Sequence, residues 1–210
     1  KDMSAEIAKT AIDYLFSHSG DKVAVTFYGG EPLLKYDLLK ELVEYSRKKN
    51  RVERKELSFS MTTNLALMTR EIAEYLASIE DFAVLCSIDG PEAIHDEHRV
   101  MHDGSGSFKK VIAGLKLLID AYGEKASTYI SINSVMTPPY TMEKFDEMQA
   151  FYRELSWLPK ELSIQTTYVE IEEDSELAHI FKDVHGEFEP YEIFSPLCDW
   201  IDKQDEKKED

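Results

Sequence analysis

The sequence predicts an α/β fold built on a parallel sheet. Short runs rich in β-branched and aromatic residues alternate with longer stretches in which apolar residues recur at helical spacing. The alternation starts with a helix and continues without a break to about residue 169. Strictly alternating helices and strands imply parallel strands joined by right-handed crossovers. A chain of 210 residues is long enough for one domain of this class.

Helices are expected where apolar residues occupy one face. Ser4, Thr69 and Thr141 should cap the first, third and fifth helices, because a hydroxyl oxygen accepts a hydrogen bond from a free N–H group of the first turn. Ser107 should start the fourth. The apolar faces span residues 7–15, 38–45, 72–79, 108–119 and 145–155.

Strands are expected between these helices, at residues 23–28, 57–62, 82–88, 129–135 and 162–167. A fold of this kind rarely begins with a helix, so we expect a further strand and its loop before residue 1. Without that strand, residues 23–28 form an exposed edge, whose unpaired N–H and C=O groups favour an edge-to-edge dimer of the fragment. Residues 1–169 should form the core domain, and the acid-rich residues 170–210 an extension or the start of a C-terminal region.

The composition excludes several classes of partner. The chain has 24 Lys and Arg against 41 Asp and Glu, a formal charge of −17, which argues against a nucleic-acid partner. It contains no apolar run of membrane-spanning length and no secretory signal, so no membrane partner is expected. Cys86 and Cys198 are too few for a disulfide framework, and this favours a cytoplasmic protein.

Small and polar residues lie at the carboxyl end of each predicted strand. Those at the ends of the first four are Gly29, Gly30, Glu31 and Pro32, then Thr63 and Asn64, then Ser87, Asp89 and Gly90, then Asn133; residues 165–168 end the fifth. Ligands of parallel α/β folds bind at the carboxyl ends of the strands. Two adjacent glycines also let the backbone approach a ligand or adopt a positive φ. The alternative is ordinary turn chemistry, because these residue types are common in such loops.

The connection over residues 90–106 is long for this fold class, where about two to six residues are usual. Arg99 is its single arginine, and a guanidinium suits a carboxylate ligand. The alternative is that Arg99 balances the acidic side chains around it in a surface ion pair. His95, His98 and His102 could form a metal site, although scattered histidines in an acidic loop are more common.

These segments together resemble the radical S-adenosylmethionine (SAM) superfamily. The resemblance rests on residues 25–34, which contain Gly-Gly-Glu-Pro, and on 61–64, 85–91, 95–99 and 104–108, in this order. Within the superfamily the match is to the SPASM-type peptide and protein maturases. It implies a partial (βα)6 TIM-like barrel whose first strand is missing from this chain.

Two departures from the family pattern stand out. The family's Cys-x-x-x-Cys-x-x-Cys loop and its SPASM cysteines are absent from this chain. The resemblance therefore implies a [4Fe–4S] cluster whose ligands lie outside the chain, with no metal ligand and no catalytic residue within it. The usual Thr-Asn-Gly is replaced by Thr63, Asn64 and Leu65.

The resemblance also implies how SAM would be bound. Gly29, Gly30 and Glu31 would line the pocket for the amino group of SAM, and Ser87 and Arg99 would hold its carboxylate. Thr63, Asn64 and Asn133 would lie near the sugar or the sulfonium, and Val169 near the adenine.

The implied function is a maturase that uses a 5′-deoxyadenosyl radical to modify a side chain of a peptide or protein partner. An anaerobic sulfatase-maturing enzyme is the alternative within the family. A non-catalytic barrel fragment that acts as a binding module is the alternative from another class. This fragment alone is expected to be inactive.

Overall fold

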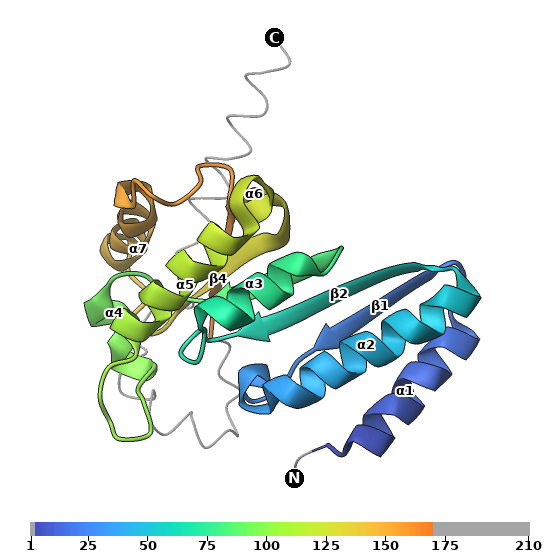
Figure 1. The fold of residues 1–210 in the computed structure, drawn as a ribbon. Coiled ribbons are helices and arrows are strands. Elements are labelled where there is room, and N and C mark those ends of the chain that lie inside the picture. The colour runs from blue at the N-terminus through green and yellow to red at the C-terminus, as the bar shows by residue number, and fades with distance from the viewer. Residues whose placement is uncertain (1–2, 170–210) are drawn as a thin grey trace.

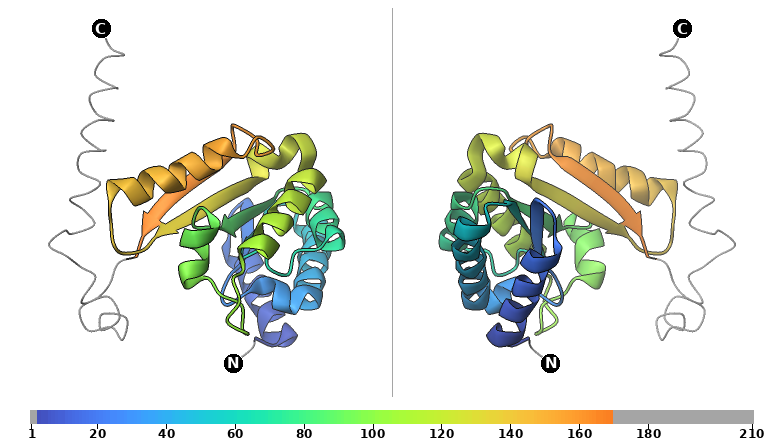
Figure 2. Two further views of the ribbon diagram at one scale, coloured as in Figure 1. Left: turned by 90° about the vertical axis from the view of Figure 1, so that its left-hand side faces the viewer. Right: turned by 90° about the vertical axis from the view of Figure 1, so that its right-hand side faces the viewer.

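A parallel sheet forms the centre of the structure, a computed structural model that describes residues 3–169 (Figure 1). Its five strands are β1 (Lys22–Phe27), β2 (Glu56–Thr63), β3 (Phe82–Ser87), β4 (Ile130–Met136) and β5 (Ser163–Tyr168). Each strand pairs with the next one along the chain, in the order β1-β2-β3-β4-β5. The sheet is open, and its twist turns β4 and β5 away from the direction of β1 (Figure 2). The predicted α/β fold is therefore confirmed, and the open parallel sheet is consistent with a partial barrel.

One helix precedes β1, and the others lie between successive strands. They are α1 (Ala5–His18), α2 (Tyr36–Glu53), α3 (Arg70–Ser78), α4 (Glu92–His98), α5 (Phe108–Tyr122), α6 (Ala126–Tyr129) and α7 (Met142–Glu154), with short 3-10 turns at Pro32–Lys35 and Gly123–Lys125. None of the helices in the described ranges is long and apolar enough to cross a membrane.

The three predicted helix caps are confirmed. The side chains of Ser4, Thr69 and Thr141 accept hydrogen bonds from N–H groups in the first turns of α1, α3 and α7. Ser107 precedes α5, but its side chain makes no capping bond. The carboxylate of Asp96 instead accepts from the Phe108 N–H at 2.9 Å, so a residue of α4 caps α5.

The two faces of the sheet differ in chemistry. Phe59, Val84 and Ile132 belong to the apolar core shared with the helices and are buried. Residues of the opposite parity, such as Ser60, Ser87 and Asn133, are partly exposed. A parallel sheet covered on both faces is apolar on both, so the second face is suited to contact a polar ligand or another segment.

Each observed strand lies within about two residues of its predicted bounds, but α4 was not expected. Cys86 of β3 is a fully buried core residue. The expected extension over residues 170–210 lies outside the described residues, so the proposed domain boundary stays a prediction.

Candidate ligand-binding site

The carboxylate of Glu31 joins the end of β1 to the end of β2. One oxygen accepts from the Thr63 hydroxyl at 2.7 Å and from the Leu33 N–H at 3.0 Å. The other accepts from the Asn64 N–H at 2.7 Å. These charge-assisted bonds hold two loops at the carboxyl end of the sheet in a fixed relation. Glu31 thus supports the loops, which leaves the exposed backbone before it available to a ligand.

Gly29 and Gly30 supply that backbone. Their φ angles are +105° and +44°, values that residues with a Cβ adopt at a cost. A Cβ added to either glycine would meet no atom within 4 Å. The backbone conformation, rather than a lack of space, therefore requires glycine at these two positions.

The side chains of Thr63 and Asn64 stabilise the turn after β2 through local hydrogen bonds. The Thr63 side chain is buried, and its hydroxyl also accepts from the Leu65 N–H at 3.0 Å. The Asn64 side-chain oxygen accepts from the Ala66 N–H at 3.0 Å. Both side chains shape the rim, and Asn64 is the more exposed of the two.

Ser87 and Asn133 lie side by side on the polar face. They are register partners across β3 and β4, and Asn133 pairs in the same way with Gln165 of β5. The Asn133 side-chain oxygen accepts from the Thr167 hydroxyl at 3.3 Å. The structure thus brings these two predicted residues together at one end of the sheet.

Arg99 forms an ion pair with Asp89, which follows β3. Arg99 Nη2 lies 3.1 Å from Asp89 Oδ1, and Nε donates to Oδ2. The same Oδ1 accepts from the Val135 N–H of β4 at 2.9 Å. The Asp89 side chain is 6% exposed and that of Arg99 is 29% exposed. The pair is therefore a partly buried one at the ends of β3 and β4, unlike the solvated surface pair considered as the alternative.

His95 is fully buried beside this pair. Its Nδ1 accepts from the Asp89 N–H at 3.2 Å, and its Nε2 lies 3.0 Å from the Ser107 hydroxyl. Because both ring nitrogens are engaged, the ring has no free position for a metal. Residues 3–169 contain no group of three His, Cys, Asp or Glu side chains that could hold a metal ion.

Val169 directly follows β5, and its backbone is held by the last residue of β4 and by the loop after it. Its N–H donates to the Met136 carbonyl at 3.2 Å, and its carbonyl accepts from the Tyr140 hydroxyl at 2.7 Å. The residue therefore lies at the same end of the sheet as the other predicted contacts, and its side chain is partly exposed.

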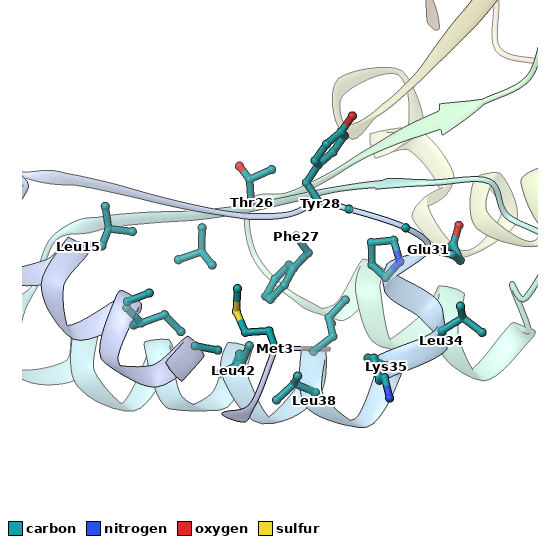
Figure 3. Close-up of a pocket in the computed structure, with 18 of the residues that line it drawn as sticks. Met3, Leu15, Thr26, Phe27, Tyr28, Glu31, Leu34, Lys35, Leu38 and Leu42 are labelled. Carbon is teal, nitrogen blue, oxygen red and sulfur yellow. The ribbon is translucent and has the colours of Figure 1, made fainter. Parts of the chain in front are cut away.

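A groove of about 770 Å³ runs along the edge strand β1, between α1 and α2 (Figure 3). Met3, Leu38 and Leu42 lie on the helix side of the strand, whereas Tyr28 points away from them. The loop at residues 29–31 closes one end. Neither Ser87 nor Arg99 lines this groove, so it does not unite the predicted contacts to the amino and carboxylate groups.

The side chains that hold Arg99 in place were not predicted from the sequence. Asp89 was identified only as a polar rim residue, and Ser107 only as a helix start. The available signal was an aspartate two residues beyond Ser87, together with a single arginine in the same loop.

The fold defines an α/β protein of the barrel-like class. Proteins of this class typically bind ligands at the carboxyl ends of the strands. The chain belongs to the radical SAM superfamily, because the model of that family matches residues 1–152. The predicted family is therefore confirmed.

Two curated relatives illustrate the family. The radical SAM cyclopropyl synthase TigE of Paramaledivibacter caminithermalis is 29% identical over 126 residues, which are 60% of this chain and 24% of TigE. A serine-type anaerobic sulfatase-maturating enzyme of Bacteroides thetaiotaomicron is 35% identical over 118 residues, which are 55% of this chain and 28% of that enzyme. The chain thus spans about a quarter of the length of these relatives.

Solved structures share the fold. Native anSMEcpe with bound AdoMet and Kp18Cys peptide matches with a TM-score of 0.68 and 24% identity, over 79% of this chain and 43% of that chain. Streptococcus suis SuiB bound to the precursor peptide SuiA matches with a TM-score of 0.58 and 16% identity, over 98% of this chain and 41% of that chain. Both likenesses show that the chain shares its fold with these structures.

Members of the family use SAM and an iron–sulfur cluster. The described residues do not fit the cluster, because their free cysteine, Cys86, lies inside the core, where burial raises the pKa of the thiol. The strand ends do fit the amino-acid part of SAM, since they combine exposed backbone at Gly29 and Gly30 with the guanidinium of Arg99.

Proposed function

We propose that this chain is the SAM-binding core of a maturase, which uses a 5′-deoxyadenosyl radical to modify a side chain of a peptide or protein. The names of the relatives support this proposal, since they include a cyclopropyl synthase and sulfatase-maturating enzymes. Because the chain covers only part of each relative, the activity is that of the full-length protein. The fragment alone is expected to be inactive.

The observation that carries the proposal is the placement of Arg99. Its guanidinium lies at the ends of β3 and β4, where Asp89 holds it by one edge. A guanidinium binds a carboxylate through two parallel N–H bonds. We assign the carboxylate of SAM to Arg99 and the Ser87 hydroxyl.

The remaining groups of SAM are assigned to residues at the same end of the sheet. Backbone carbonyls at Gly29 and Gly30 suit the ammonium group of SAM, with Glu31 as the support of their loop. Asn64 and Asn133 present side-chain amides for the sugar or the sulfonium, and Thr63 orients the Asn64 turn. Val169 is assigned to the adenine.

The substrate is assigned as a peptide or protein because anSMEcpe and SuiB have each been solved with a peptide. Anaerobic sulfatase maturation is the second candidate, and the matching enzymes of Bacteroides thetaiotaomicron and Clostridium novyi favour it. The cytoplasmic location stays a prediction from the cysteine content.

Calorimetric titration of SAM into the full-length, cluster-loaded protein tests the assignment. Arg99→Ala should weaken SAM binding by about 10- to 150-fold, the loss expected for a charge-assisted contact. Arg99→Lys should restore only part of the affinity, because an ammonium cannot form the two-bond fork.

The matched control is Arg70→Ala. Arg70 is an exposed arginine of α3 whose nearest carboxylate oxygens, on Glu74 and Asp120, are 3.8 and 3.9 Å away. This variant should bind SAM like the parent. Equal affinity of Arg99→Ala and the parent would show that the carboxylate assignment is wrong. A full-length protein that lacks the three-cysteine loop before Lys1 would favour the binding-module alternative.

A further inference from the structure

The guanidinium of Arg99 is held along one of its two edges. Nε and Nη2 form the side-on pair of N–H groups, and both point to the carboxylate of Asp89. Nη1 and the second N–H of Nη2 form the end-on pair, and no residue in the described range 3–169 accepts from them. A guanidinium has room for a second carboxylate at this end-on pair.

Burial and two neighbouring groups fix the position of Asp89. Its side chain is buried, and Oδ1 accepts from the Val135 N–H of β4. Its own N–H donates to Nδ1 of His95 on α4. Asp89 therefore links the end of β3 to β4 through its carboxylate and to α4 through its backbone N–H.

The backbone of Arg99 is fixed through the same histidine. A backbone N–H can only donate, so Nδ1 of His95 accepts from Asp89 and the ring proton lies on Nε2. Nε2–H then donates to the Ser107 hydroxyl, which in turn donates to the Arg99 carbonyl at 2.7 Å. One buried ring thus links the backbone of Asp89 to the backbone of Arg99.

We propose that Asp89 is a positioning residue for SAM binding, which holds the side-on edge of Arg99 so that the end-on edge faces the carboxylate of SAM. This inference rests on the proposed function, since it takes SAM as the ligand of Arg99. Asp89 acts through Arg99 and needs no contact with SAM.

The positioning role and a purely electrostatic role of Asp89 predict opposite changes in SAM affinity when its charge is removed. A carboxylate near an anionic ligand group repels it, so Asp89→Asn would tighten SAM binding if only charge mattered. If Asp89 sets the direction of the guanidinium, the same substitution weakens binding by about 10-fold, because the amide –NH2 cannot accept from Nε. The sign of the change therefore separates the two roles.

The experiment measures the affinity of two ligands for the full-length, cluster-loaded protein by calorimetry. The ligands are SAM and decarboxylated SAM, which lacks the group assigned to Arg99. Asp89→Asn should weaken SAM binding about 10-fold and leave the binding of decarboxylated SAM unchanged. In the Arg99→Ala background, Asp89→Asn should cause no further loss of SAM binding. Asp103→Asn is the control and should bind both ligands like the parent. Asp103 is an exposed carboxylate that, within residues 3–169, accepts side-chain hydrogen bonds from Ser105 alone.

The outcomes separate this inference from the proposed function. Equal SAM binding by Arg99→Ala and the parent overturns the assignment of the carboxylate to Arg99, and the inference with it. If Arg99→Ala weakens binding but Asp89→Asn does not, only the positioning role is wrong. The positioning role is also wrong if Asp89→Asn weakens the binding of SAM and of decarboxylated SAM equally, or if the losses of SAM affinity add in the double variant. Either result indicates a general disruption of the site.

Asp89→Glu covers the case in which Asp89→Asn does not fold. This variant keeps the buried charge but moves the carboxylate by one methylene group. A selective loss of SAM binding relative to decarboxylated SAM supports the positioning role, and parent-like binding of both ligands refutes it.

Discussion

Leu65 adopts a left-handed backbone conformation at the position where the family motif has glycine. Its φ is +61°, and its side chain is fully buried. A non-glycine residue pays about 1–2 kcal/mol for this conformation, whereas a buried leucine side chain contributes about 2–5 kcal/mol. Burial therefore outweighs strain, which explains how this chain accommodates leucine in the turn.

Leu65→Gly should destabilise the protein by about 2 kcal/mol, because the lost burial exceeds the relieved strain. Arg54 provides the comparison, since it also has a positive φ, +55°, but is exposed. Arg54→Gly should be neutral or stabilising by up to about 1 kcal/mol. Urea unfolding of both variants measures the difference, and stabilisation by Leu65→Gly would contradict this account.

The stability of the protein should fall with acid partly because of His95. Burial lowers the pKa of its ring, the nearby Asp89 and Asp96 oppose this shift, and Arg99 adds to it. Below about pH 6.5 the unfolded histidine binds a proton that the folded one does not, so the unfolded state is favoured as the pH falls. Through this group, the free energy of unfolding falls by up to about 1.4 kcal/mol for each unit by which the pH is lowered.

Unfolding free energies measured at pH 8 and pH 5.5 test this prediction. The loss between the two values should be smaller in His95→Gln than in the parent, although the variant is less stable at pH 8. The same loss in both proteins would exclude His95 as its source.

At the scale of the element, the start of α5 depends on a glycine two residues before the helix. A Cβ at Gly106 would lie 1.9 Å from Asp96 Oδ2, and Asp96 caps the helix through the Phe108 N–H. Gly106→Ala should displace this cap and lower the free energy of unfolding by about 1–2 kcal/mol. Thermal or urea unfolding measures the change.

Gly20→Ala is the matched control, because its Cβ would meet no atom within 4 Å and its φ is not positive. This variant should keep the parent's stability. If Gly106→Ala does so too, Asp96 is not an essential cap.

Periodicity was sufficient to predict the long elements, because their apolar residues are the ones that build the core. It missed α4, since this helix of 7 residues has a mostly polar sequence and only Ile94 and His95 are buried. The start of α5 at Ser107 was predicted, but the partner of the Ser107 side chain was not. That partner, the Arg99 carbonyl, lies eight residues away in the chain and is close only in the folded loop.

The position of the candidate site could be predicted from the sequence, but its side-chain hydrogen bonds could not. Residues at the carboxyl ends of parallel strands must share one end of the sheet, so Ser87 and Asn133 could be placed together from sequence. The bond from Thr63 to Glu31 spans 32 positions, and nothing in the local pattern indicates it. Side-chain partners of this kind follow from tertiary packing alone.

At the scale of the whole molecule, β1 is an edge strand of the described sheet and flanks the apolar groove of Figure 3. Unpaired backbone groups along an edge favour pairing with another strand. The 210-residue chain should therefore form dimers in solution, and light scattering measures this. Ala24→Lys places a charge at an exposed position of β1 and should shift the equilibrium to the monomer. A monomeric parent chain would contradict the prediction.

The order of the strands has a consequence for how the chain folds. Every strand of the described sheet pairs only with strands that directly precede or follow it in sequence, so no distant segment has to arrive before pairing starts. The sheet can grow during synthesis, one strand and helix at a time, from the end that leaves the ribosome first. Amide hydrogen exchange should then be slowest in β3, which has a neighbour on each side and the fully buried Val84 and Cys86, and faster toward β1 and β5. A strand added beside β1 would extend the slow-exchanging region outward by one strand.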